Sequence, residues 1–123
     1  MDTIKYDKYN TKASDALICF IQSWSPSALY MAHQLDKLRH NKEIKLKILL
    51  IDYDNDIIHD TIQLNMTPVC IIRKNGKNVL IRRNGYTDNI YLMGSLKKDQ
   101  LKQLITQIEQ YDDKNQPFLE LSF

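Results

Sequence analysis

The sequence predicts an α/β fold, with a mixed sheet of four to five strands and helices on both of its faces. Apolar runs rich in strand formers lie at 17–21 and 46–51, and a segment with helical periodicity separates them, which predicts two parallel strands joined by a helix. Asn75-Gly76 lies between two further strand-like runs and predicts an antiparallel hairpin. A chain of 123 residues with 43% hydrophobic residues has enough material for one such domain.

Charge and composition exclude several classes of protein. The 17 basic and 15 acidic residues leave a net charge of +2, so the chain as a whole has no pull toward nucleic acid or an anionic membrane. The longest apolar stretch, 16–21, is too short to span a bilayer, and residues 1–11 are not a secretory leader. The 2 cysteines are too few for a disulfide framework or a zinc cage. We therefore expect no metal, no other cofactor and a reducing compartment, either nuclear or cytoplasmic.

The first half of the chain predicts a strand, a helix and a second strand. A polar segment at 7–15 is expected as a first short helix, and the unbroken apolar run at 17–21 is typical of a strand buried on both faces. Pro26 suits the first turn of a helix over 26–40. Apolar residues recur there at spacings of three and four: Ala28, Met31, Ala32, Leu35 and Leu38. The run at 46–51 is the second buried strand.

The middle of the chain predicts a short helix and a hairpin. Ile58 and Ile62 mark the short helix, and a third strand is expected at 69–72. After the Asn75-Gly76 turn, an antiparallel strand is expected at 79–82.

The last part predicts another turn, an extended piece and an amphipathic helix. Asn84-Gly85 is the turn, and the extended piece is expected at 90–93. The apolar positions of the last helix are Leu101, Leu104, Ile105 and Ile108. We divide the chain into a domain at 1–111 and a tail at 112–123, which is polar and then apolar. Whether the tail folds back onto the domain stays open.

This order of elements resembles the thioredoxin fold over residues 16–108. The matching features are the turn Trp24-Ser25-Pro26-Ser27-Ala28 after the first strand, Thr67-Pro68 before the third, and the hairpin Lys74-Asn75-Gly76-Lys77. Redox thioredoxins carry two cysteines in that turn, and the first is a thiolate whose pKa is lowered at a helix N-terminus. Here Ser25-Pro26-Ser27-Ala28 replaces that motif, so the resemblance implies a fold without its thiol–disulfide chemistry and no enzyme.

The two cysteines of the chain lie outside that turn. Cys19 and Cys70 are flanked by apolar strand residues and are expected to be buried structural thiols, with a contact between the two as the alternative. In the thioredoxin resemblance, the position of Cys19 is that of the family's buried acid.

A narrower resemblance rests on two departures from ordinary thioredoxins. Pro26 follows Trp24 by two positions rather than three, and the segment at 77–94 is long. Both features, and the spacing Trp24–Asp52–Pro68, are similar to the Dim family, the small thioredoxin-like subunits of the spliceosomal U-five snRNP. That resemblance implies a subunit that acts in nuclear pre-mRNA splicing through protein–protein contacts. Its partners would include large spliceosomal subunits, with RNA associated only indirectly.

The resemblance also implies a candidate binding groove. In the thioredoxin fold, the peptide bond that corresponds to Thr67-Pro68 is cis and lies beside the turn. An extended peptide pairs with the backbone there. The candidate residues are Trp24, Ser25, Pro26, Ser27, Thr67 and Pro68. The alternative is that Trp24 and Pro68 only shape the fold.

Basic residues concentrate around the predicted hairpin. They are Arg73, Lys74, Lys77, Arg82 and Arg83. One interpretation is contact with RNA phosphate or an acidic partner, and the other is a charged edge that resists aggregation.

Other constellations do not support a function. The acidic run at 52–56 has Ile57 and Gln63 where a calcium loop needs glycine and glutamate, and no histidine has a partner at a recognisable spacing. The functional alternative to an interaction protein is a divergent thioredoxin-like thiol protein in redox homeostasis or protein folding, which would use Cys70 or Cys19.

Overall fold

The computed structural model describes residues 4–9, 14–54, 64–85 and 89–123. The elements in chain order are β1 (Ala16–Ile21), α1 (Pro26–Arg39), β2 (Ile48–Asp52), β3 (Val69–Lys74), β4 (Lys77–Asn78), β5 (Ile81–Arg83), β6 (Leu92–Met93), α2 (Lys98–Gln110) and β7 (Leu119–Leu121).

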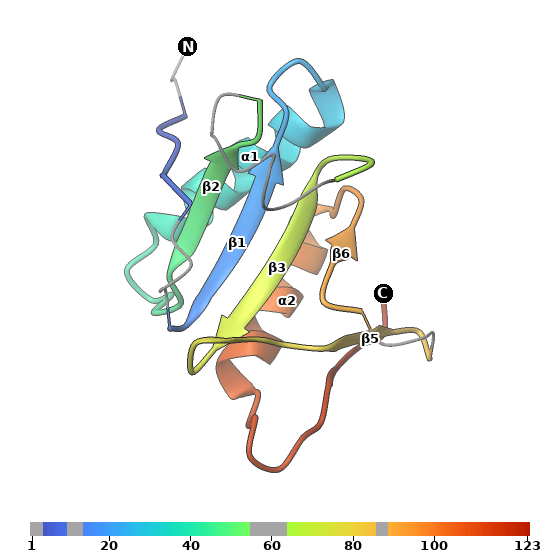
Figure 1. Cartoon of the computed structure of the whole chain (residues 1–123). Helices are drawn as coiled ribbons and strands as arrows, with labels where there is room; N and C mark the ends of the chain where they lie inside the picture. The colour runs from blue at the N-terminus through green and yellow to red at the C-terminus, as the bar shows by residue number, and fades with distance from the viewer. Residues whose placement is uncertain (1–3, 10–13, 55–63, 86–88) are drawn as a thin grey trace.

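The central sheet is mixed and has five strands (Figure 1). Its order is β2-β1-β3-β4, and β6 also pairs with β3. β1 and β2 are parallel because the chain crosses between them through α1, whereas β3 is antiparallel to β1, β4 and β6. The predicted α/β class with a mixed sheet is therefore confirmed.

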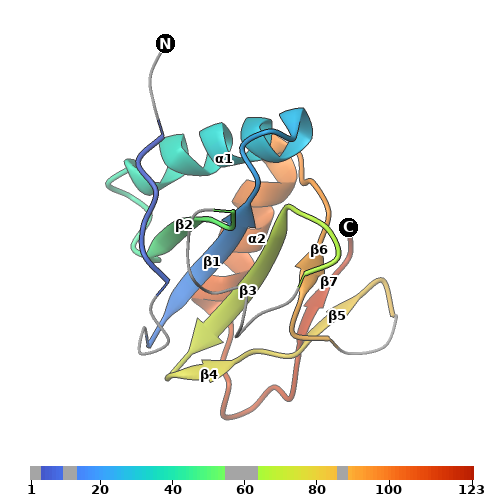
Figure 2. The same ribbon diagram turned by 45° about the horizontal axis from the view of Figure 1, so that its top comes forward.

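Both helices of the described part of the chain pack on the same face of the sheet (Figure 2). Alternate side chains of β1, namely Leu17, Cys19 and Ile21, point into the core that α1 and α2 cover. The other face carries an aromatic cluster in which Phe20 lies 5.7 Å from Tyr9 and 6.3 Å from Tyr53, centroid to centroid. The short helix predicted around Ile58 and Ile62 lies outside the described residues.

The helix predicted at 7–15 is wrong over residues 7–9, which are not helical. Asp7 instead forms a parallel bridge with Ile51, and its backbone N–H donates to the carbonyl of Leu50 at 2.7 Å. The Asp7 carboxylate accepts the backbone N–H of Leu50 at 2.9 Å. These bonds across the edge of the sheet hold the segment extended beside β2.

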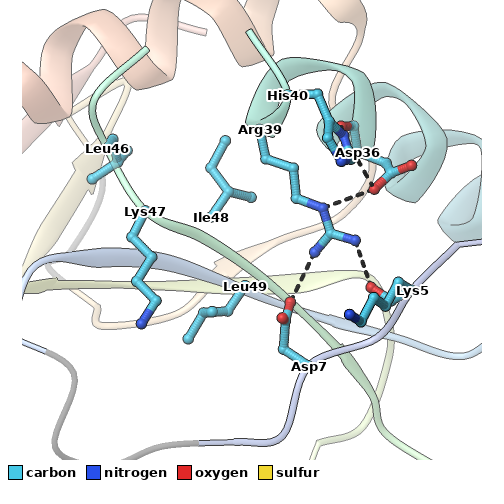
Figure 3. Close-up of a pocket in the computed structure, with 9 residues that line it drawn as sticks. All are labelled: Lys5, Asp7, Asp36, Arg39, His40, Leu46, Lys47, Ile48 and Leu49. Atoms are coloured by element: carbon cyan, nitrogen blue, oxygen red, sulfur yellow. Dashed lines mark hydrogen bonds and ion pairs between the residues drawn. The ribbon is translucent and has the colours of Figure 1, made fainter. Parts of the chain in front are cut away.

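Arg39, at the end of α1, ties this segment to the body (Figure 3). Its guanidinium contacts Asp36 Oδ1 at 2.7 Å, Asp7 Oδ2 at 2.8 Å and the carbonyl of Lys5. The cluster borders a cavity of about 520 Å³. Because these charges pair with one another, we place the candidate functional site elsewhere.

The Asn75-Gly76 hairpin forms as predicted, with φ of 53° and 77° at the two turn residues. The antiparallel strand predicted at 79–82 is wrong, because the strand that pairs with β3 is β4 at Lys77–Asn78. Val79 adds one bond, from its N–H to the carbonyl of Ile72 at 2.8 Å, and residues 81–82 belong to β5, which pairs with β7. The chain then leaves the sheet because β6 occupies the edge of β3 at Val69 and Cys70. The extended piece predicted at 90–93 contains β6.

The tail packs back onto the domain. β7 pairs in parallel with β5 in a second, two-stranded sheet, and Leu119 and Leu121 are buried in the core that the helices cover. Across the described ranges, no helix combines the length and apolar character needed to cross a membrane.

Candidate functional site

The Trp24 turn links the end of β1 to the start of α1. The N–H of Ser25 donates to the carbonyl of Gln22 at 3.0 Å, which closes the turn. Ser25 is the extended N-cap residue of α1, with φ −91° and ψ 115°, and Pro26 follows in the first helical turn, as predicted. The Trp24 side chain is 71% exposed.

The Thr67-Pro68 peptide bond is cis, as the thioredoxin resemblance implied. The Thr67 hydroxyl donates to Gln22 Oε1 at 2.8 Å, and Gln22 Nε2 donates to Asp54 Oδ1 at 2.9 Å. Gln22 therefore connects the Trp24 turn with the proline segment and with the turn that follows β2. Our reading of the sequence missed Gln22, and the only available signal was a polar residue directly after a buried strand.

A third segment completes the neighbourhood of Pro68. The N–H of Gly94 donates to the carbonyl of Pro68 at 3.0 Å, and Met93 is the register partner of Val69. The side chains of Met93 and of Met66, two residues before Pro68, are 49% and 45% exposed. Thr67 is half-buried and Pro68 is buried. We call the exposed side chains of Trp24, Met66 and Met93, together with the Thr67-Pro68 backbone, the Trp24–Pro68 surface.

The two serines of the predicted groove lie at its helical side. Ser25 Oγ and Ser27 Oγ are 3.5 Å apart. Ala28, in the place of the second family cysteine, is fully buried. The start of α1 therefore presents hydroxyl groups and no sulfur.

Both cysteines are free thiols, and both are fully buried. They are opposite each other in the antiparallel register of β1 and β3. The contact with the Cys70 thiol, together with burial, raises the pKa of Cys19 well above its ordinary value. Neither sulfur is accessible for exchange with a partner in this conformation. Within the ranges that the structure describes, no group of three His, Cys, Asp or Glu side chains is arranged to hold a metal ion.

The structure does not bring the predicted basic residues together on one edge. Arg73 is 8% exposed and points to the aromatic face, where Nη2 donates to the Tyr9 hydroxyl at 3.1 Å. Lys74 and Lys77 face each other at the base of the hairpin turn. Arg82 and Arg83 contact the tail instead.

Arg82 contacts an aromatic ring and Arg83 contacts backbone carbonyls of their own chain. Arg82 stacks on the ring of Phe118, with its guanidinium carbon 3.8 Å from the ring centroid. Arg83 donates to the carbonyls of Phe123 and Met93. The tail thus occupies two of the side chains for which the sequence suggests contact with RNA or an acidic partner.

A parallel strand–helix–strand unit, an antiparallel strand preceded by a cis-proline and a last helix on the face of α1 define the thioredoxin fold. Among solved structures, the chain is similar to a mutant thioredoxin from Halobacterium salinarum NRC-1. The TM-score is 0.56 at 17% identity, covering 77% of this chain and 74% of that chain. No family model and no curated protein matches the chain. The likeness shows the fold.

Proposed function

We propose that this chain is a non-catalytic interaction protein that binds an extended segment of a protein partner at the Trp24–Pro68 surface. The observation that carries the proposal is an exposed indole in the turn that Gln22 bonds to the cis-proline segment, at a helix start that holds no sulfur.

The chemistry of the turn supports the non-catalytic part. A serine hydroxyl becomes a nucleophile only with an adjacent base, and Ser25 Oγ lies beside a second hydroxyl, that of Ser27. Ala28 carries no nucleophile. In the folded conformation the two thiols are enclosed in the core, out of reach of a disulfide of a substrate.

The surface itself supports the binding part. Trp24, Met66 and Met93 expose large apolar side chains, and buried tryptophans dominate binding energies at protein interfaces. The bonds from Thr67 to Gln22 and from Gly94 to Pro68 fix the backbone before a partner arrives, which lowers the entropy cost of binding. A partner in extended conformation would pair with the backbone at Thr67.

For the biological setting, we propose a divergent Dim-like subunit that acts in nuclear pre-mRNA splicing. The spacing Trp24–Asp52–Pro68 and the long segment at 77–94 support this choice. The partners would be large spliceosomal proteins, and RNA would be reached through them, because three of the five basic residues at the hairpin contact their own chain.

Affinity capture from an extract of the native organism tests both parts. We expect splicing factors to be retained by the wild type and reduced about tenfold or more by Trp24→Ala, since loss of an interface tryptophan removes roughly 2 kcal/mol or more of binding free energy. Leu80→Ala is the matched control. Leu80 is also exposed, at 42%, but lies in the connection between β4 and β5, away from the Trp24 turn (Figure 2).

Two outcomes would count against these proposals. Recovery of redox or metabolic clients without splicing factors contradicts the spliceosomal setting. Equal retention by the wild type and Trp24→Ala contradicts the Trp24–Pro68 surface.

The juxtaposition of Cys19 and Cys70 favours a second candidate, a divergent thiol protein in redox homeostasis or protein folding. Reduction of insulin in the presence of dithiothreitol separates the two functions. An interaction protein gives no turnover above the reagent blank. Turnover that is lost in Cys70→Ser would replace the interaction proposal with the thiol function.

A further inference from the structure

Cys19 and Cys70 are direct partners in the antiparallel register of β1 and β3. Antiparallel partners are of two kinds, and they alternate along the ladder. Hydrogen-bonded partners have Cα atoms roughly 5.5 Å apart, whereas non-hydrogen-bonded partners approach to roughly 4.5 Å and bring their side chains closer. The kind of pair sets how closely the two thiols approach each other.

The bonds of β1 show in which direction Cys19 points its backbone groups. The N–H of Leu17 donates to the carbonyl of Lys47, and the carbonyl of Ile21 accepts from the N–H of Tyr53, each at 2.9 Å. Both bonds lead toward β2. Successive residues of a strand direct their backbone N–H and C=O groups to opposite edges. Cys19 is two residues from Leu17 and two from Ile21, so its backbone groups also point toward β2 and away from β3.

The bonds of β3 give the same answer from the other side. The carbonyl of Ile72 accepts from the N–H of Val79 at 2.8 Å, and that of Pro68 accepts from Gly94 at 3.0 Å. These bonds lead toward β4 and β6. Cys70 has the same parity and therefore directs its backbone groups away from β1. The Cys19–Cys70 pair is thus a non-hydrogen-bonded pair, the closer of the two kinds.

The side chains of this pair also share a face. Both cysteines lie in the core cluster that α1 and α2 cover, and both are fully buried. The Cα separation of a close antiparallel pair lies within the range of roughly 4.4–6.8 Å that a disulfide needs. No rearrangement of the sheet is required to bring the two sulfurs together.

We propose that Cys19 and Cys70 form an intramolecular, cross-strand disulfide when the protein meets a peroxide. One thiol loses its proton, the thiolate attacks a peroxide oxygen, the O–O bond breaks, and hydroxide leaves and takes up that proton as water, which leaves a sulfenic acid. The second thiol loses its proton and its thiolate attacks that sulfur, so that the S–S bond forms, the S–O bond breaks and the departing hydroxide takes up the proton as a second water. Two thiols and one hydrogen peroxide become one disulfide and two waters.

This modification site does not depend on the proposed binding function. The dithiol lies in the core, whereas the Trp24, Met66 and Met93 side chains of the Trp24–Pro68 surface are exposed. Because neither sulfur is exposed, the oxidant reaches them when the sheet opens locally, so the reaction is slower than that of an exposed thiol. The product would join residues 19 and 70 within an otherwise unchanged sheet.

Intact-mass measurement of the full chain tests the proposal, since the chain holds only 2 cysteines. The reduced protein is treated with hydrogen peroxide, unfolded in guanidinium and alkylated with iodoacetamide. We expect a mass lower by two hydrogens with no alkylation, a retained near-ultraviolet circular dichroism spectrum, and two alkylated thiols after dithiothreitol. Two free thiols after oxidation, disulfides only between chains, or loss of the folded spectrum would overturn the proposal.

A diagonal pair gives the matched control. In Cys70→Ala/Ile72→Cys the second thiol stays on the same face and equally buried, since Ile72 is 1% exposed, but it opposes Leu17 rather than Cys19. Diagonal neighbours are roughly 7–8 Å apart, too far for a disulfide. We expect closure at least tenfold slower than in the wild type. Equal rates would mean that the disulfide forms in the unfolded chain and does not depend on the pairing of Cys19 with Cys70 in the sheet. If this variant does not fold, the mass measurement on the wild type tests the proposal by itself.

Discussion

At the scale of single residues, the most perturbed environment is that of Cys19. The side chain lies in the core between the sheet and the two helices, with no access to water, and the neighbouring Cys70 thiol and burial both favour its protonated form. A thiolate in this position would lose its hydration without gaining a cation. The folded protein therefore holds this proton at pH values where the unfolded chain releases it.

That difference predicts a loss of stability in alkali. Above about pH 9, the ordinary thiol value, the folded state binds more protons than the unfolded state, so the free energy of unfolding falls as pH rises. The slope for one such group is about 1.4 kcal/mol per pH unit. Guanidinium titrations in reducing buffer between pH 7 and pH 10 measure it. Cys19→Ala is expected to be less stable at neutral pH by roughly 1 kcal/mol but to show a flatter alkaline limb. Identical slopes would contradict this assignment.

Single residues were predictable from the sequence where their roles are local. Trp24 and Pro26 belong to a turn that is determined by residues next to one another in the sequence, and the structure contains that turn. Gln22 was missed because its partners, Thr67 and Asp54, are 45 and 32 positions away. Arg82 and Arg83 were interpreted as part of a basic patch because their partners in the tail are also remote in the sequence.

At the scale of elements, the Asn75-Gly76 hairpin connects three parts of the chain. Asn75 donates from its backbone to Asp15 Oδ1 and from its side chain to Asp113 Oδ2, each at 2.8 Å. The N–H of Gly76 donates to the carbonyl of Ser14 at 2.9 Å. The turn thus fixes the start of β1 and the segment after α2 as well as its own two strands.

Gly76→Ala is expected to lower the free energy of unfolding by about 1 kcal/mol. Its φ of 77° disfavours any side chain by about 1–2 kcal/mol, and the reduced freedom of the unfolded chain offsets part of this cost. A Cβ at this position meets nothing within 4 Å, so the effect is one of backbone conformation alone. Asn78→Ala, at an exposed position of β4, serves as control and should change the stability by less than about 0.5 kcal/mol. A variant at Gly76 as stable as the wild type would refute the argument. Urea denaturation measures all three proteins.

Elements with strong periodic or apolar patterns were predictable, and those defined by remote pairing were not. The core strands and both described helices follow from apolar runs and helical spacing. The end of β4 depends on β6, which reaches β3 from about twenty residues further along the chain, as the pairing of Cys70 with Leu92 shows. Likewise, residues 7–9 are not helical because Asp7 forms a bridge with Ile51 at the edge of β2 and an ion pair with Arg39. Both partners are remote in the sequence.

At the scale of the whole molecule, the tail is part of the folded body. β7 completes a second sheet with β5, and Arg82 and Arg83 contact Phe118 and Phe123 around it. The sequence showed that the tail is apolar at its end, but the place where it packs depends on β5 leaving the main sheet. That departure was itself not predictable from local pattern.

Leu121→Ala is expected to destabilise the entire domain by about 3 kcal/mol, as for other buried leucines that leave a cavity. Ser122→Ala is the control, because that side chain is exposed, and it should change the stability by less than about 0.5 kcal/mol. Chemical denaturation followed by far-ultraviolet circular dichroism measures both. If Leu121→Ala unfolds at the same denaturant concentration as the wild type, β7 contributes nothing to the core.

The position of Trp24 has a practical consequence. It is the single tryptophan of the chain, and it is 71% exposed in the folded state. An indole already in water emits light at nearly the same wavelength before and after unfolding. Fluorescence from this protein is therefore a poor gauge of whether it is folded and a direct gauge of whether something covers its indole.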